Sequence, residues 1–76
     1  MLKSLSKIRV NTLCKVVSVD EKIKIKRRVF ELGIVPNEIV KVLSISPLKN
    51  SFLIAVKNYS LALRKQIVDN IMVEEI

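Results

Sequence analysis

The single glycine of this 76-residue chain, Gly33, limits how the backbone can turn. Much of the sequence alternates apolar and polar residues, which is typical of short strands, and a sheet of short strands needs several tight turns. Such turns often use residues with positive φ, the conformation that glycine adopts most readily. Gly33 follows a segment of helical spacing and precedes Pro36. The pattern therefore places it just past a helix, either in a left-handed conformation or packed too closely for a Cβ.

The apolar residues indicate one small, mainly β domain that spans residues 1–76. Half of the residues are hydrophobic but only 4% are aromatic, so the core must consist of Ile, Val and Leu, which suit pleated strands. A chain of this length is near the lower limit for a single apolar core without metals or disulfides. We therefore expect no second domain.

Five strand-like segments and two helical segments are expected along the chain. The strands are predicted at Leu13–Val19, Glu38–Ser46, Phe52–Lys57, Tyr59–Leu63 and Ile71–Val73. A helix is predicted from about Lys24 to Leu32, with Ile25 and Val29 on its apolar face, although the alternation at its start also fits an edge strand. One or two helical turns are expected within Arg64–Asn70. Five short strands with one helix between the first two predict a small closed or nearly closed barrel.

Catalysis and metal binding are not expected from these residues. The chain has no histidine that could activate its one cysteine, Cys14, and a lone cysteine forms no internal disulfide. Cys14 has apolar neighbours in a predicted strand, so we interpret it as a small core residue. One glycine cannot build a phosphate-binding loop. The adjacent carboxylates, Asp20 with Glu21 and Glu74 with Glu75, are expected to diverge into solvent. The sequence thus predicts no enzyme, no cofactor and no metal site.

The charge and the N-terminal segment indicate a cationic cytoplasmic protein. Fourteen Lys and Arg against seven Asp and Glu give a net charge of +7, which favours a nucleic acid, an anionic membrane surface or an acidic protein face as partner. The lone cysteine fits a reducing compartment. No signal-peptide or membrane-spanning run is visible in the sequence, so membrane insertion is not expected.

The most concentrated charge is the run of Lys22, Lys24, Lys26, Arg27 and Arg28. On a helix, part of this run forms a positive face opposite the apolar positions. It is either a solvated face or a docking patch for an acidic partner or for phosphates. Grooves for single-stranded nucleic acid usually carry stacking aromatics, which are missing beside this run, so nucleic-acid binding ranks second.

Two segments, RRVFELGIVPNEIVKV and YSLALRKQIVDNIMV, resemble the ferrous iron transport protein A (FeoA) family. That family carries an Arg-Leu-x-x-Leu-Gly-hydrophobic-x-Pro-Gly segment and a later Gly-x-x-Leu-Ala-Leu-Arg segment that ends in Ile-x-Val. The residues that match the first pattern are Arg28, Leu32, Gly33, Pro36, Val40 and Val42, and those that match the second are Leu61, Ala62, Leu63, Arg64, Ile71 and Val73. The resemblance covers nearly the whole chain.

Asn11, Asn37 and Asn58 stand where the family typically has glycine. Asparagine is the other residue that readily adopts positive φ. We therefore expect these three residues to take the left-handed turns that a chain with one glycine still needs.

The resemblance implies a five-stranded SH3-like barrel without catalytic activity. It also implies a cytoplasmic accessory to the ferrous iron permease FeoB, which docks on the GTP-binding part of that permease. Similar barrels form the C-terminal domain of iron-dependent repressors. A stand-alone relative of that domain and a small nucleic-acid-binding barrel therefore remain the alternatives.

The docking face is predicted to be mixed, apolar and basic. Its expected residues come from the helix and from the loop that joins the second and third strands as a hairpin: Lys24, Arg27, Arg28, Leu48 and Lys49. The alternative is that Arg28 and Arg64 only cap carbonyls or pair with nearby carboxylates. Weak self-association through an open barrel edge also stays open.

Overall fold

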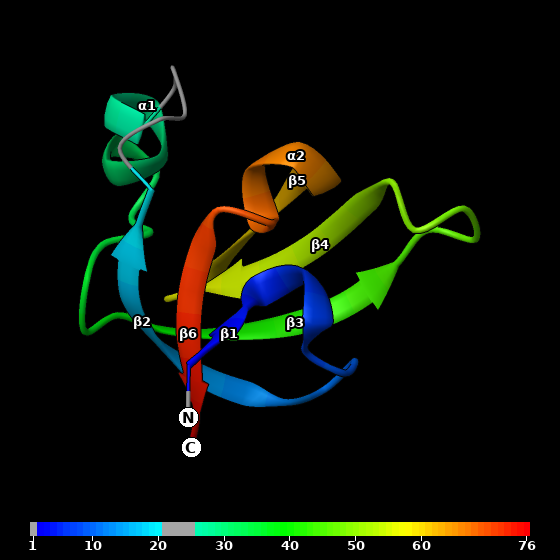
Figure 1. The fold of residues 1–76 in the computed structure, drawn as a ribbon, viewed down its shortest axis with the longest axis horizontal. Helices are drawn as coiled ribbons and strands as arrows, with labels where there is room; N and C mark the ends of the chain where they lie inside the picture. Colours follow the sequence, from blue (N-terminus) through cyan, green and yellow to red (C-terminus); the bar gives the residue numbers. More distant parts are fainter. Residues whose placement is uncertain (1, 21–25) are drawn as a thin grey trace.

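Six strands form one antiparallel sheet, in the order β1-β6-β2-β3-β4-β5 (Figure 1). The computed structural model describes residues 2–20 and 26–76. The strands are β1 Lys3–Ser4, β2 Leu13–Val19, β3 Ile39–Ile45, β4 Ser51–Val56, β5 Tyr59–Arg64 and β6 Ile71–Glu75. The helical segments are η1 Leu5–Lys7, α1 Lys26–Glu31 and α2 Lys65–Val68. The mainly β architecture is confirmed, with α1 between β2 and β3 and α2 before β6.

The described residues form one strand more than predicted. The extra strand, β1, has two residues, and it pairs with β6 through Lys3 with Val73 and Ser4 with Met72. This pairing places the start of the described chain beside its last strand (Figure 1). Within the described part of the chain, β1 and β5 are the outer strands of the sheet, which is therefore open.

Bulges in two strands change the simple alternation of buried and exposed residues. In β2 the register with β6 shifts between Val16 and Ser18, so Val17 is an extra residue and the next buried side chain is Val19. A similar shift follows Val42 in β3. Bulges increase the local twist, which helps such short strands to wrap around one core.

The core consists almost entirely of branched aliphatic side chains. Its buried members come from every strand longer than two residues and from the helical segments and loops: Leu5, Ile8, Cys14, Val16, Val19, Val29, Ile34, Val40, Val42, Phe52, Ile54, Val56, Leu63, Val68, Ile71 and Val73. No polar or charged side chain of the described residues is buried with them. The core composition thus agrees with the prediction from the low aromatic content.

Gly33 ends α1 in a Schellman motif. The Gly33 N–H donates to the Phe30 carbonyl at 3.0 Å, and the Ile34 N–H donates to the Val29 carbonyl at 3.2 Å. These are the two bonds of that motif, in which the residue after the helix is left-handed. The φ of Gly33 is +98°. Lys24 and Ile25, at the start of the predicted helix, lie outside the described residues.

The left-handed turns use two of the three asparagines. Asn11 and Asn37 have φ of 67° and 75°. The prediction for Asn58 is wrong, because Lys57 has positive φ instead, at 55°. Val56 pairs with Tyr59, so Lys57 and Asn58 form a two-residue hairpin loop. In the II′ form of such a loop only the first of the two residues needs positive φ.

Cys14 is a buried core residue, as the sequence predicts. Its Sγ lies 3.7 Å from the Val40 carbonyl oxygen. Burial, with a smaller effect of the Glu75 carboxylate, raises the pKa of this thiol to about 11. The thiol therefore keeps its proton at neutral pH and is a poor nucleophile.

Raising the pH from about 9 to about 11 should destabilise the wild-type protein more than a Cys14→Ala variant. The folded state holds the thiol proton to a higher pH than the unfolded chain does, so stability falls as pH rises through this window. The difference between the two proteins is at most about 2.7 kcal/mol, since one pKa unit is worth about 1.36 kcal/mol. Urea unfolding at both pH values measures it, and equal losses in the two proteins would contradict the prediction.

Candidate docking groove

A groove of about 390 Å³ lies between α1, β5 and α2. We call it the α1–β5 groove. The residues that line it are Arg28, Val29, Leu32, Leu61, Ala62, Leu63, Arg64 and Ile67. Four of them are consecutive residues of β5. Because successive side chains of a strand point to opposite faces, a groove that touches four in a row runs along the edge of the strand.

The end of α1 is held against the start of β5 by Tyr59. The Tyr59 hydroxyl donates a hydrogen bond to the Leu32 carbonyl. The same hydroxyl occupies the space that a Cβ on Gly33 would take, at 2.5 Å from its ideal position. The Schellman turn and this hydrogen bond therefore fix the position of α1 beside β5, and with it the wall of the groove.

The floor of the groove is apolar and its rim is basic. Val29 and Leu63 are buried, while Leu32, Leu61 and Ile67 are only half-buried, so a ligand can still remove their apolar surface from water. Arg28 and Arg64 are exposed, and neither forms an ion pair with any residue in the described part of the chain. None of the described residues that line the groove is a carboxylate. Two guanidinium groups that no described carboxylate neutralises, beside an apolar floor, suit a partner that carries both carboxylates and apolar side chains.

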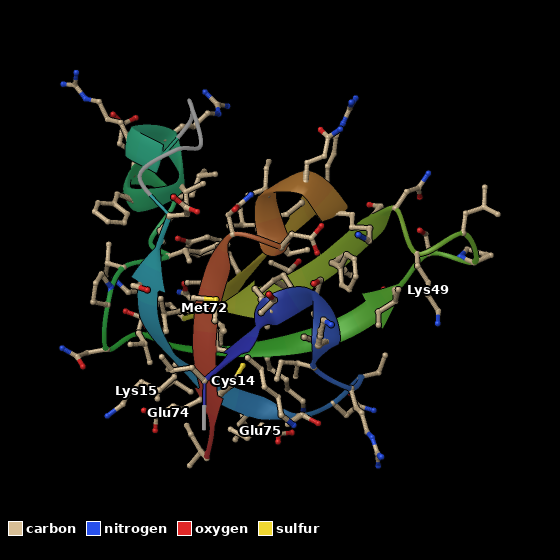
Figure 2. All side chains as sticks on the ribbon, in the orientation of Figure 1. Cys14, Lys15, Lys49, Met72, Glu74 and Glu75 are labelled. Atoms are coloured by element: carbon tan, nitrogen blue, oxygen red, sulfur yellow. The ribbon has the colours of Figure 1, made fainter. Side chains whose placement is uncertain are left out.

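The structure does not bring the predicted docking residues together. Arg28 lines the groove, but Arg27 is 94% exposed outside it, with its Nε 3.6 Å from Glu31 Oε1. Leu48 and Lys49 lie in the β3–β4 loop, which is at the opposite end of the molecule from α1 (Figures 1 and 2). Lys24 is outside the described residues.

Sequence reasoning did not assign Arg64 to the docking face. Arg64 was considered only as a local cap or ion-pair partner, and the structure shows no ion pair for it among residues 2–20 and 26–76. The available signal was its place in YSLALR, the segment that also supplies the three β5 side chains of the groove. Only the pairing of β5 at the outer edge of the sheet shows that these residues line one surface.

The described part of the protein contains neither a metal-binding cluster nor a membrane-spanning helix. No cluster of three or more His, Cys, Asp or Glu side chains there is arranged to hold a metal ion. No helix among the described residues has the length and apolar character needed to cross a membrane. What the α1–β5 groove offers is apolar surface, guanidinium groups and the edge of a strand.

Fold and groove define a small SH3-like β domain with a basic-rimmed surface groove. The FeoA domain model matches residues 3–75. The chain therefore belongs to the FeoA family, which is associated with ferrous iron transport, and the match indicates no enzymatic family.

Solved structures of FeoA proteins share this fold. The solution structure of FeoA from Chlorobium tepidum is 26% identical, with a TM-score of 0.89 over 97% of this chain and 70% of that chain. FeoA from Stenotrophomonas maltophilia, solved with zinc, is 29% identical, with a TM-score of 0.82 over 95% of this chain and 89% of that chain. It is described as a procaryotic SH3 domain protein and a candidate ferrous iron transport activating factor. The predicted SH3-like fold is thus confirmed.

The same fold occurs in metal-dependent repressors. A manganese-dependent transcriptional repressor aligns with a TM-score of 0.90 at 16% identity, over 99% of this chain and 42% of that chain. IdeR from T. acidophilum aligns with a TM-score of 0.85 at 17% identity, over 99% of this chain and 34% of that chain. At these identities the likeness shows the fold alone. It agrees with the predicted similarity to the C-terminal domain of such repressors. No curated protein matches the chain.

Proposed function

We propose that this protein is a cytoplasmic accessory of ferrous iron uptake that docks on the cytosolic GTP-binding part of a FeoB-type permease. The observation that carries the proposal is the α1–β5 groove in a member of the FeoA family. The described residues of the groove have the composition of an interface centre, because they are apolar side chains and arginines without a carboxylate. The proposed role is recognition, with no catalytic step.

The net charge of +7 supports an acidic partner surface. A large net charge on a small domain speeds its association with a surface of opposite charge, and it makes that association sensitive to salt. The isolated cytosolic domain of the permease from the same organism is the direct probe. Calorimetry should show one-to-one binding that weakens at least tenfold between about 0.05 M and about 0.5 M salt, because long-range attraction is screened.

A generic RNA, titrated in the same way, tests the alternative that the protein binds nucleic acid. If the permease domain does not bind and the RNA binds with a steep dependence on salt, the protein is a nucleic-acid-binding barrel and the proposal is wrong. If neither binds at low salt, docking through a charged face is wrong as well.

A further inference from the structure

The outer edge of β5 carries backbone groups that pair with no other strand among the described residues. β5 is the last strand of the sheet in the described part of the chain, with β4 on one side. Its hairpin closes at the Val56–Tyr59 pair and continues through Ala55–Ser60 and Ile54–Leu61. Hydrogen-bonded and non-hydrogen-bonded pairs alternate in such a ladder, so Ser60 and Ala62 direct their N–H and C=O groups away from β4. Such an edge is a template for another strand.

The α1–β5 groove lies along this edge. It touches Leu61, Ala62, Leu63 and Arg64 in succession, so a chain seated in it runs beside the backbone of β5. Its apolar surface comes from alternate β5 residues and from the two helices. A strand placed there would turn every second side chain toward this floor, which is the pattern of recognition by strand addition.

Charge selects among the chains that could occupy the edge. Arg28 and Arg64 lie at the groove, and none of the described residues that line it is a carboxylate that could neutralise them. A second copy of this protein would bring another net charge of +7 to the same place, and like charges disfavour that pairing. A segment with carboxylates between its apolar residues satisfies both the arginines and the floor.

We propose that an extended acidic segment of a partner protein binds in the α1–β5 groove as an additional strand beside β5. Its backbone pairs with Ser60 and Ala62, its apolar side chains cover Leu61 and the helix residues of the floor, and its carboxylates meet Arg28 and Arg64. The inference rests on the proposed function and specifies the form of the segment that the permease would present.

A short peptide in which valine and glutamate alternate is the first probe. It should bind the wild-type protein, whereas a peptide with lysine in place of glutamate should bind at least tenfold more weakly. On binding, the Ser60 and Ala62 amides should become protected from hydrogen exchange, because they gain acceptors. Equal binding of both peptides, or binding without protection at these amides, would overturn the proposal.

The substitution Ala62→Pro removes one outward N–H while leaving the bonds to β4 in place, since proline is tolerated at solvent-facing positions of edge strands. It should weaken peptide binding about tenfold, the value of roughly one hydrogen bond. Thermal unfolding of the variant checks that it folds. If the variant does not fold, hydrogen exchange at the Ser60 and Ala62 amides of the wild-type protein decides whether the peptide adds as a strand. Undiminished binding by folded Ala62→Pro would exclude strand addition.

The permease domain separates this inference from the proposed function. If it binds wild-type protein and folded Ala62→Pro equally, docking stands and strand addition is wrong. If it fails to bind the wild-type protein while the peptide binds, the edge recognises acidic segments but the proposed partner is wrong. If the protein alone forms dimers and Ala62→Pro abolishes them, the occupant of the groove is a second copy of the protein, and the proposal of an acidic segment is wrong.

Discussion

Replacing Gly33 with valine is expected to lower the free energy of unfolding by about 3 kcal/mol. Gly33 has φ of +98°, where a residue with a Cβ is strained by about 1–3 kcal/mol and a β-branched one most of all. The new Cβ would lie 2.5 Å from the Tyr59 hydroxyl. That hydroxyl must move, which costs its hydrogen bond to Leu32, worth about 1 kcal/mol.

Thermal unfolding measures this effect. For a domain of this size, about 3 kcal/mol corresponds to a fall in Tm of roughly 12–24 °C. Asn37→Gly is the matched control, because it changes another residue with positive φ, at 75°, to the type that tolerates it, and stability should stay within about 0.5 kcal/mol. If the Gly33→Val protein had the Tm of the wild type, the turn at Gly33 beside Tyr59 would accept a side chain without strain, and the prediction would be wrong.

The double substitution of Arg28→Glu with Arg64→Glu is expected to weaken binding to the permease domain at least about 100-fold. Each change removes a charge-assisted hydrogen bond, worth about 1.5–3 kcal/mol, and adds a like charge opposite an acidic segment. Both side chains are exposed and unpaired within the described residues. The substitutions should therefore leave stability within about 0.5 kcal/mol.

Arg9→Glu with Lys49→Glu provides the same change in net charge away from the groove. Both residues are exposed, and neither lines the α1–β5 groove. Only the general electrostatic attraction should fall, by a few-fold at physiological salt. If this control weakened binding as much as the groove variant does, the partner would be recognised by overall charge and the α1–β5 groove would have no special role.

Most of the sheet was predictable because its buried face follows the strand period. Leu13–Val19 was predicted to the residue, since Cys14, Val16 and Val19 face the core on either side of one bulge. β1 was missed because two residues carry no period at all, and it forms only through its partner β6.

The groove was less predictable than the fold. Sequence reasoning found Arg28 from the density of charge, but it grouped this residue with Leu48 and Lys49, which the sheet holds at the far end of the molecule (Figure 2). Arg64 enters the groove only because β5 pairs at the outer edge of the sheet, next to α1. Asn58 was assigned the left-handed turn on residue type, whereas the hairpin register gives that conformation to Lys57. Long-range pairing, which no local pattern encodes, decided the first two outcomes, and the register of a local hairpin decided the third.

Mapping the contact surface by NMR shows directly whether the permease domain binds at the α1–β5 groove. The isotope-labelled protein is titrated with the unlabelled cytosolic domain of the permease, and backbone amide shifts are followed along the chain. We expect the largest changes to cluster in α1, β5 and α2, around Arg28, Ala62 and Arg64, and the β3–β4 loop with Lys49 to stay unchanged. Changes centred on the β3–β4 loop, or none at saturating permease domain, would contradict docking through the α1–β5 groove.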